Sequence, residues 1–141
     1  MHPTVIAAWN DQATVTLRNQ CSGRLLRTHP NKTIDACGKE EESKPTQWRV
    51  HRTNASSLPA HIKLEPLLHP GEFLYITERG NLAIGPVMCE FAVERDGDLF
   101  VFEPLMNPSW YLGSNSDGTL RCPKDTILLD DHAHFTAHRV D

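Results

Sequence analysis

The chain has 141 residues, a formal net charge of −4 and 39% hydrophobic residues. This is the size of one ordinary domain, which is large enough to bury a core without disulfide bonds. No apolar stretch approaches the roughly 18 residues of a membrane-spanning helix, and the segment MHPTVIAAWND lacks the basic and long apolar regions of a signal peptide. We therefore expect no membrane insertion, and a leaderless protein that is either cytoplasmic or exported by an unconventional route.

One short pattern occurs three times along the chain: a bulky doublet, a polar turn and then an aliphatic residue. It reads RLLRTHPNKTIDA at 24–36, EFLYITERGNLAI at 72–84 and WYLGSNSDGTLR at 110–121. Asn, Asp and Gly in the turns favour hairpins, and internal repetition predicts a repeated architecture. The first interval is longer than the second, which indicates an insertion in the first unit around the charged stretch GKEEESKP. We expect its charge run, KEEE at 39–42, to form a solvated loop.

Each hairpin is preceded by an alternating apolar run and followed by a strand centred on an aromatic residue. Alternation with a period of two turns one face of a strand inward. Each unit therefore supplies four strands. The sequence predicts an all-β chain, a β-trefoil of twelve strands in three pseudo-symmetric repeats, formed by a single domain over 1–141 with repeats at about 13–58, 59–98 and 99–141. We expect nine equivalent side chains to be buried: Leu26, Leu74, Leu112, Ile34, Leu82, Leu120, Trp48, Phe91 and Phe135.

Four cysteines lie far apart and form no CxxC pair, which argues against a zinc site. Two disulfides are possible for an even number of cysteines, but without a secretory signal we favour buried free thiols. The cysteines are Cys21, Cys37, Cys89 and Cys122.

A histidine-rich segment is the one weak candidate for a metal site. His132, His134 and His138 have the spacing that places them on one face of a strand, where neutral imidazoles can converge on a transition metal. The alternative is an exposed strand end that changes its charge near pH 6–7. Since Phe135 is expected to face inward, the histidines would face outward, and we expect no metal and no other cofactor.

Sequence motifs of catalysis are missing. The chain has no GxSxG, P-loop, GxGxxG or HExxH pattern. Asp96 and Asp98 flank Gly97 in a stretch typical of a tight turn between strands. We therefore expect a protein that is not an enzyme.

Three segments carry a resemblance to the fibroblast growth factor and interleukin-1 superfamily of β-trefoils, and the resemblance is closer on the growth factor side. They are CSGRLLRTHPNKTIDACG, EFLYITERGNLAIG and the stretch from CEFAVER to NPSWYLGSNSDGTL. Cys89 stands at the family's characteristic cysteine, followed by Phe91 and the pair Glu94 and Arg95, while Trp110 and Tyr111 match its Trp-aromatic pair. The resemblance implies a signalling protein that binds a cell-surface receptor, with heparan sulfate as co-ligand.

The heparin-binding loop and the receptor-contact stretches depart from the family pattern. The two leading basic positions of that loop are Asn115 and Ser116, and only Arg121 and Lys124 remain basic. Residues 53–141 hold 6 basic and 13 acidic residues, a net charge of −7, whereas residues 1–52 hold 8 and 5, a net charge of +3. We therefore expect weak or no heparin binding, and a candidate partner surface on the more basic first repeat: Arg18, Arg24, Arg27, Arg49 and Arg52.

The expected function is that of a growth-factor-like or cytokine-like protein that acts by protein–protein recognition. The alternative is an intracellular β-trefoil that serves as a scaffold or an actin-associated cytoskeletal adaptor. Sugar binding of the lectin type is less favoured because the repeats lack a QxW signature. Nothing in the sequence points to nucleic acid as a partner.

Overall fold

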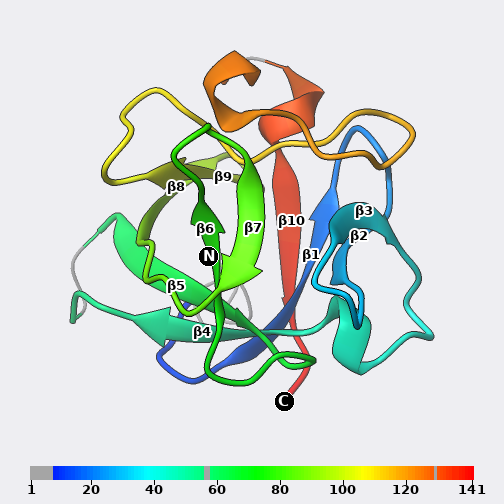
Figure 1. Ribbon diagram of the computed structural model, residues 1–141. Coiled ribbons are helices and arrows are strands. Elements are labelled where there is room, and N and C mark those ends of the chain that lie inside the picture. The colour runs from blue at the N-terminus through cyan, green and yellow to red at the C-terminus, as the bar shows by residue number, and fades with distance from the viewer. Residues whose placement is uncertain (1–7, 56–57, 129) are drawn as a thin grey trace.

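The computed structural model describes residues 8–55, 58–128 and 130–141. Within these residues the chain forms ten strands and three short 3-10 helices (Figure 1). The strands are β1 Thr14–Asn19, β2 Leu25–Thr28, β3 Ile34–Gly38, β4 Trp48–Arg52, β5 Ala60–Pro66, β6 Phe73–Ile76, β7 Leu82–Gly85, β8 Phe91–Asp96, β9 Leu99–Pro104 and β10 Phe135–Arg139, and the helices are η1 Lys44–Thr46, η2 Pro123–Asp125 and η3 Asp131–Ala133. None of the helices in the described part of the chain has the length and apolarity needed to cross a lipid bilayer.

Six strands close into an antiparallel barrel. Their order is β10-β9-β8-β5-β4-β1, and β1 pairs with β10 to complete the ring. The closing ladder runs from Val15 opposite Arg139 to Asn19 opposite Phe135. A closed barrel leaves no free sheet edge among these strands. The predicted all-β fold is confirmed, and its strand order is consistent with a β-trefoil.

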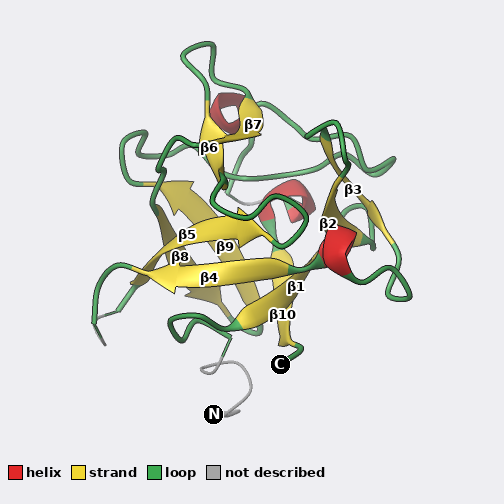
Figure 2. Cartoon of the chain, turned by 60° about the horizontal axis from the view of Figure 1, so that its bottom comes forward, coloured by secondary structure: helices red, strands yellow, loops and turns green. Residues whose placement is uncertain are grey.

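Two hairpins lie at one end of the barrel, and Figure 2 shows β6–β7 above the barrel strands and β2–β3 to the right of them. The third hairpin does not form two strands, which is why there are ten strands and not the predicted twelve. Its two arms meet in the isolated bridge between Ser114 and Leu120. The backbone N–H of Tyr111 donates to the carbonyl of Pro123 and that of Leu112 donates to the carbonyl of Phe102, so the first arm bonds outside the hairpin.

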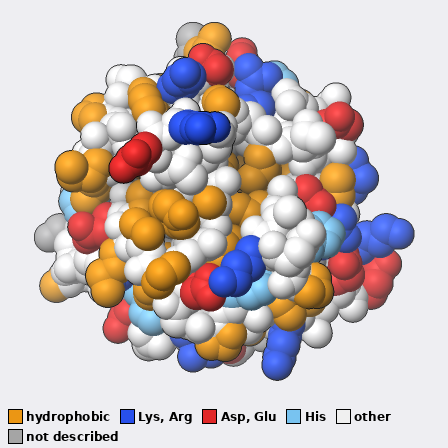
Figure 3. All heavy atoms as spheres, viewed as in Figure 1, with side chains coloured by type: hydrophobic (Ala, Val, Ile, Leu, Met, Phe, Trp, Pro, Cys, Tyr) orange, Lys and Arg blue, Asp and Glu red, His pale blue; other side chains and the backbone are white. Residues whose placement is uncertain are grey.

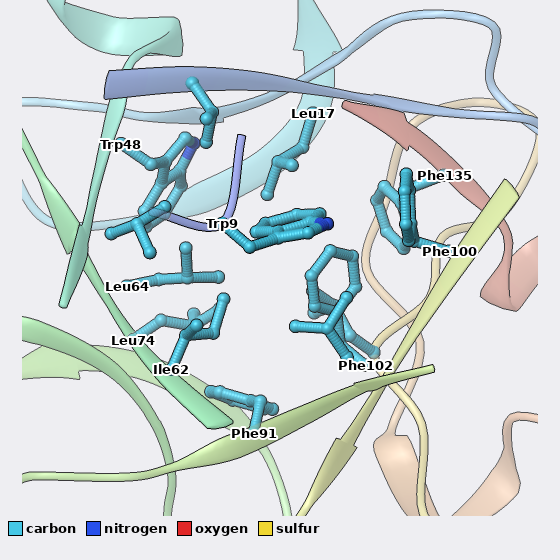
Figure 4. Packing of buried hydrophobic residues seen from close by; sticks show 14 of the residues in the cluster. Trp9, Leu17, Trp48, Ile62, Leu64, Leu74, Phe91, Phe100, Phe102 and Phe135 are labelled. Atoms are coloured by element: carbon cyan, nitrogen blue, oxygen red, sulfur yellow. The ribbon is translucent and has the colours of Figure 1, made fainter. Parts of the chain in front are cut away.

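The core fills the barrel and the space beneath the hairpins (Figure 4). Strand β5 illustrates how the sequence builds it, since Ala60, Ile62 and Leu64 alternate inward while the residues between them are half-buried. Of the nine side chains predicted to be buried, six are buried: Leu26, Leu74, Leu112, Trp48, Phe91 and Phe135. The other three, Ile34, Leu82 and Leu120, are only half-buried and pack against the edge of the core.

Trp9 is a core residue that precedes the predicted repeats. Its ring meets Phe100 edge-on with centroids 5.2 Å apart and meets Phe102 at 5.6 Å. Figure 4 shows it in the middle of the core, between Leu17 and Phe102. Ala8 and Trp9 therefore help to fill the barrel, although nothing in the threefold pattern of the sequence marks them.

Candidate functional site

The charged insertion of the first repeat folds back onto the arginines of that repeat. Arg18 on β1 forms an ion pair with Glu40 and donates a hydrogen bond of 2.8 Å to the carbonyl of Gly23. Arg27 on β2 is held from two sides, because its guanidinium contacts both Asp35 on β3 and Glu42 in the insertion at 3.0 to 3.1 Å. The stretch predicted to be a solvated loop thus neutralises part of the basic surface.

Asp35 is the centre of this network. It accepts hydrogen bonds from Arg27, from the backbone of Cys37 and, at 2.7 Å, from the ring of His29. Burial acts to raise the pKa of Asp35, but the hydrogen bonds from Arg27, His29 and Cys37 outweigh it and lower the pKa overall. The carboxylate is therefore fixed in its charged form, and the network acts as a structural cross-link between β2 and β3.

The remaining arginines of the candidate partner surface lie apart. Arg49 is on the outer face of β4. Burial acts to raise the pKa of Glu65 on β5, but hydrogen bonds from the backbone of Gly71 and from His51, with a smaller contribution from the charge of Arg49, lower it overall. Arg52 donates through Nε to the carbonyl of Asn54 at 3.0 Å. Arg24 lies near Asp117, whose pKa is lowered chiefly by hydrogen bonds from Thr119 and also by the arginine charge. Arg18, Arg27 and Arg52 thus have partners within the first repeat, whereas Arg24 and Arg49 form no ion pair with a carboxylate among the described residues.

The loop of residues 113–125 holds its arginine in a similar way. Arg121 donates to the amide oxygen of Asn115 at 2.8 Å and to the backbone carbonyl of Asp125 at 3.2 Å. Lys124 is exposed and its chain passes close to Gly80 of the second hairpin. Ser116 is exposed at the tip of the loop. Only two cations are therefore available here, and one of them is tied to the loop backbone.

The three histidines do not share one face of a strand, so that prediction is wrong. His132 lies in η3 and its Nδ1 is 2.8 Å from the carbonyl of Ser114. His134 is buried, with Nδ1 2.9 Å from the carbonyl of Asp130 and Nε2 3.1 Å from a carboxylate oxygen of Asp96. Only His138 is on β10, where it is exposed. Among the residues that the structure describes, no three His, Cys, Asp or Glu side chains are grouped to hold a metal ion.

All four cysteines are free thiols, and each is half-buried rather than fully buried. Two of them lie at contacts between hairpins, since Cys37 Sγ is 3.2 Å from the carbonyl of Asp117 and Cys122 Sγ is 3.1 Å from Asn81 Oδ1. Burial raises the pKa of the Cys89 thiol and keeps it in the neutral form. These thiols pack and join segments of the fold.

The second hairpin carries an apolar face that the sequence reasoning missed. Phe73 and Tyr75 lie opposite Gly85 and Ala83 across the β6–β7 ladder, so no large side chain of β7 covers the two rings. The apolar character continues into the segment after β7, where Val87 is 47% and Met88 70% exposed. We call the four side chains Phe73, Tyr75, Val87 and Met88 the apolar face. Figure 3 shows hydrophobic side chains gathered over this hairpin.

Cations border the apolar face. Lys63 on β5 places Nζ 5.4 Å from the centroid of the Phe73 ring and 3.7 Å from the sulfur of Met88. Tyr75 and Val87 line a groove together with Arg79 of the hairpin turn. Neither Lys63 nor Arg79 forms an ion pair with a carboxylate in the described ranges, although Glu78 lies beside Arg79 in the groove. The surface therefore offers aromatic and aliphatic contacts together with two positive charges, Lys63 and Arg79, and one negative charge, Glu78.

Two glutamates lie side by side on the outer faces of β8 and β9. Burial raises the pKa of Glu94, and its hydrogen bond with Glu103 and the charge of that residue raise it further. Glu103 is also held in place by the backbone N–H of Ser109 at 2.6 Å. Two like charges at cross-strand positions repel each other when both are ionised.

Glu94→Gln is therefore expected to raise the free energy of unfolding at pH 7 by about 0.5 kcal/mol, since solvent screens much of the repulsion. A raised pKa in the folded state means that the folded wild type binds the proton more tightly than the unfolded chain. The free energy of unfolding of the wild type should thus fall as the pH rises from 4.5, the usual pKa of a glutamate, through the raised pKa of the folded state. The variant should not show this decrease. Urea melts from pH 4 to 8 measure both, with exposed Glu41→Gln as control. A variant that follows the wild-type pH profile would show that the folded-state pKa of Glu94 is not raised.

No model of a known protein family matches the sequence, and a search of curated proteins returns no match. The fold and the chemistry of its surfaces therefore carry the assignment of function.

Proposed function

We propose that this chain is a growth-factor-like or cytokine-like protein that acts by binding a protein partner, not by catalysis. The single observation that supports this best is the apolar face on the second hairpin. Exposed apolar patches on small proteins mark interaction sites, and aromatic residues and methionine are enriched in protein interfaces. The face joins Tyr75 with Val87 in one groove and Phe73 with Met88 around Lys63.

The partner that fits this face presents apolar side chains flanked by carboxylates. The rings of Phe73 and Tyr75 would bury against the apolar part, and their low conformational freedom reduces the entropic cost of binding. Lys63 and Arg79 would meet the carboxylates, which sets orientation and speeds association more than it adds affinity. A cell-surface receptor domain with such a patch is the partner that the resemblance to growth factors implies.

Heparan sulfate has a minor role in this proposal. Polyanion binding needs several free cations in one place, because each neutralised charge releases a counterion. Arg18 and Arg27 are paired with acidic residues, and the loop of residues 113–125 holds only two cations, Arg121 and Lys124. The local positive field is therefore weak, and the apolar face replaces the basic loop as the main contact surface.

The membership of the growth factor and interleukin-1 superfamily is part of the same proposal. It is supported by the closed barrel with its hairpins and by the sequence around Cys89 and Phe91, where Phe91 is buried in the core. Much of this likeness consists of core and turn residues that any β-trefoil shares, so the partner decides the question.

Binding to cells tests the proposal. Fluorescently labelled protein should bind intact cells of the source organism at a saturable site, and unlabelled protein should displace it. The double substitution Val87→Glu and Met88→Glu should weaken this binding at least tenfold, because it places two acidic groups in the apolar face. Both residues are exposed in a loop, so folding should be preserved; thermal melts check this.

Ile127→Glu is the control, since Ile127 is an exposed aliphatic residue of the third repeat, 59% accessible, and is not part of the apolar face. It should bind as the wild type does. Equal binding by the control and the double variant would refute the role of the apolar face. Saturable binding that appears only after the cells are permeabilised would replace the receptor reading with that of an intracellular scaffold or adaptor.

A further inference from the structure

A hollow of about 420 Å³ opens where the three hairpins approach one another at the end of the barrel. Each hairpin contributes to it, and the residues that line it come from three equivalent places in the repeats. They are Lys32, Thr33, Ile34, Asn81, Leu82, Ala83, Leu120, Arg121 and Cys122. Ligand pockets for small molecules have volumes of about 300–1,000 Å³. We call this feature the cap hollow.

Three large aliphatic side chains form its apolar surface. Ile34, Leu82 and Leu120 occupy equivalent positions in the repeats and pack against the core on one side. The threefold pattern predicts them to be buried, yet all three are half-exposed because they border the hollow. Figure 3 shows hydrophobic side chains in the middle of this face, between the hairpins. A ligand that covers apolar area of this kind removes it from water, which lowers the free energy of the complex.

The polar part of the cap hollow is positive. None of the described residues that line it is acidic, whereas Lys32 and Arg121 are both cations. Lys32 is paired with Glu72 at 2.8 Å, just outside the lining. Arg121 gives its hydrogen bonds to the neutral oxygens of Asn115 and Asp125, so its charge is not matched by a carboxylate in the described part of the chain. A buried or half-buried cation without an anionic partner favours an anionic ligand.

We propose that the cap hollow binds a small aliphatic carboxylate. A short hydrocarbon chain would lie against Ile34, Leu82 and Leu120, and its carboxylate would face the guanidinium of Arg121 with Lys32 nearby. The site lies on the cap between the hairpins and does not include the residues of the apolar face. Its lining shares only Asn81 with the groove of the apolar face, so either proposal can fail without the other.

Methyl-resolved NMR with octanoate tests the site. In protein labelled at the Ile and Leu methyl groups, octanoate should shift the signals of Ile34, Leu82 and Leu120 along one saturable curve, with a dissociation constant below about 1 mM. Octanol has the same chain without the charge and should bind at least fivefold more weakly. Acetate has the charge without the chain and should not saturate in this range.

Arg121→Gln should weaken octanoate binding about tenfold, as expected from the loss of one charge-assisted hydrogen bond, and should leave octanol binding unchanged. Arg121→Lys keeps the positive charge and should retain most of the octanoate affinity that Arg121→Gln loses. Lys44→Gln removes an exposed cation from the first-repeat insertion, away from the hollow, and should bind octanoate as the wild type does. Unchanged core methyl signals, such as those of Ile62 and Leu64, confirm that each variant is folded.

Three results would overturn the proposal. Equal affinity for octanoate and octanol would mean that only apolar contact is at work. Shifts that centre on residues outside the cap hollow would place the ligand elsewhere, and a linear response without saturation would show that no site exists.

Discussion

Phe91→Ala should lower the free energy of unfolding by about 3–5 kcal/mol, which is typical for removal of a large ring from a packed interior. Phe91 is fully buried, and it begins β8 opposite Ile62 of β5 and Pro104 of β9. Its ring thus lies where two repeats meet in the barrel. The loss is a large share of the roughly 5–15 kcal/mol that stabilises a domain, so the variant should be only marginally folded at 37 °C.

Urea melts of wild type and variant measure this loss. Glu41→Ala is the control, because Glu41 is an exposed side chain in the insertion of the first repeat, and it should change the stability by less than about 0.5 kcal/mol. Losses of similar size in the two variants would show that Phe91 does not anchor the core.

The barrel could be predicted because the sequence pattern that forms it recurs at regular intervals. Alternation in the strands assigns Ile62 and Leu64 to the interior, and the repeated hairpin pattern relates them to Val15 and Leu17 in another repeat. Trp9 lies before the first repeat, and no equivalent tryptophan precedes the other two repeats. A side chain that fills the barrel from a single segment leaves no periodic signal, so the threefold pattern could not reveal it.

The predicted number of strands was wrong because the first arm of the third hairpin forms its backbone hydrogen bonds with other segments of the chain. The third hairpin has the same sequence pattern as the first two, but Leu112 donates its N–H to Phe102 and Tyr111 donates to Pro123. The partners of these donors lie in other segments. Local sequence predicts where the chain turns, while the competition for backbone groups between distant segments is settled only by the tertiary fold.

The surface was less predictable than the core. The arginines of the first repeat and the acidic stretch GKEEESKP are both visible in the sequence, yet their pairing depends on how the insertion folds back onto β1 and β2. A clue to the apolar face was present, since Phe73 and Tyr75 alternate on β6 while Ala83 and Gly85 alternate on β7. Reading both strands of a hairpin together finds such a face, whereas reading each strand alone does not.

The contact between the first and third hairpins gives the second large expected effect. Gly118 has a φ of +91° in the turn of the third hairpin, a region that residues with a Cβ rarely adopt. A Cβ built there would lie 2.1 Å from Cys37 Sγ and 3.1 Å from the carbonyl oxygen of Ala36. The same turn is tied to β3 by the hydrogen bond of 2.7 Å from the Ala36 N–H to the Gly118 carbonyl.

Gly118→Ala should therefore lower the free energy of unfolding by about 2–4 kcal/mol, the sum of backbone strain and overpacking. Gly71→Ala separates the two causes, because Gly71 has a similar φ of +81° with no atom within 4 Å of a built Cβ. It should lose only the strain, about 1–2 kcal/mol. Adding Cys37→Ala to Gly118→Ala should recover much of the remainder, since it removes the sulfur that the new methyl group meets. Denaturant melts of Gly118→Ala, of Cys37→Ala and of the double variant give the coupling energy between the two positions. Strictly additive effects would mean that the new methyl group does not press on Cys37, and that the loss in Gly118→Ala comes from backbone strain alone.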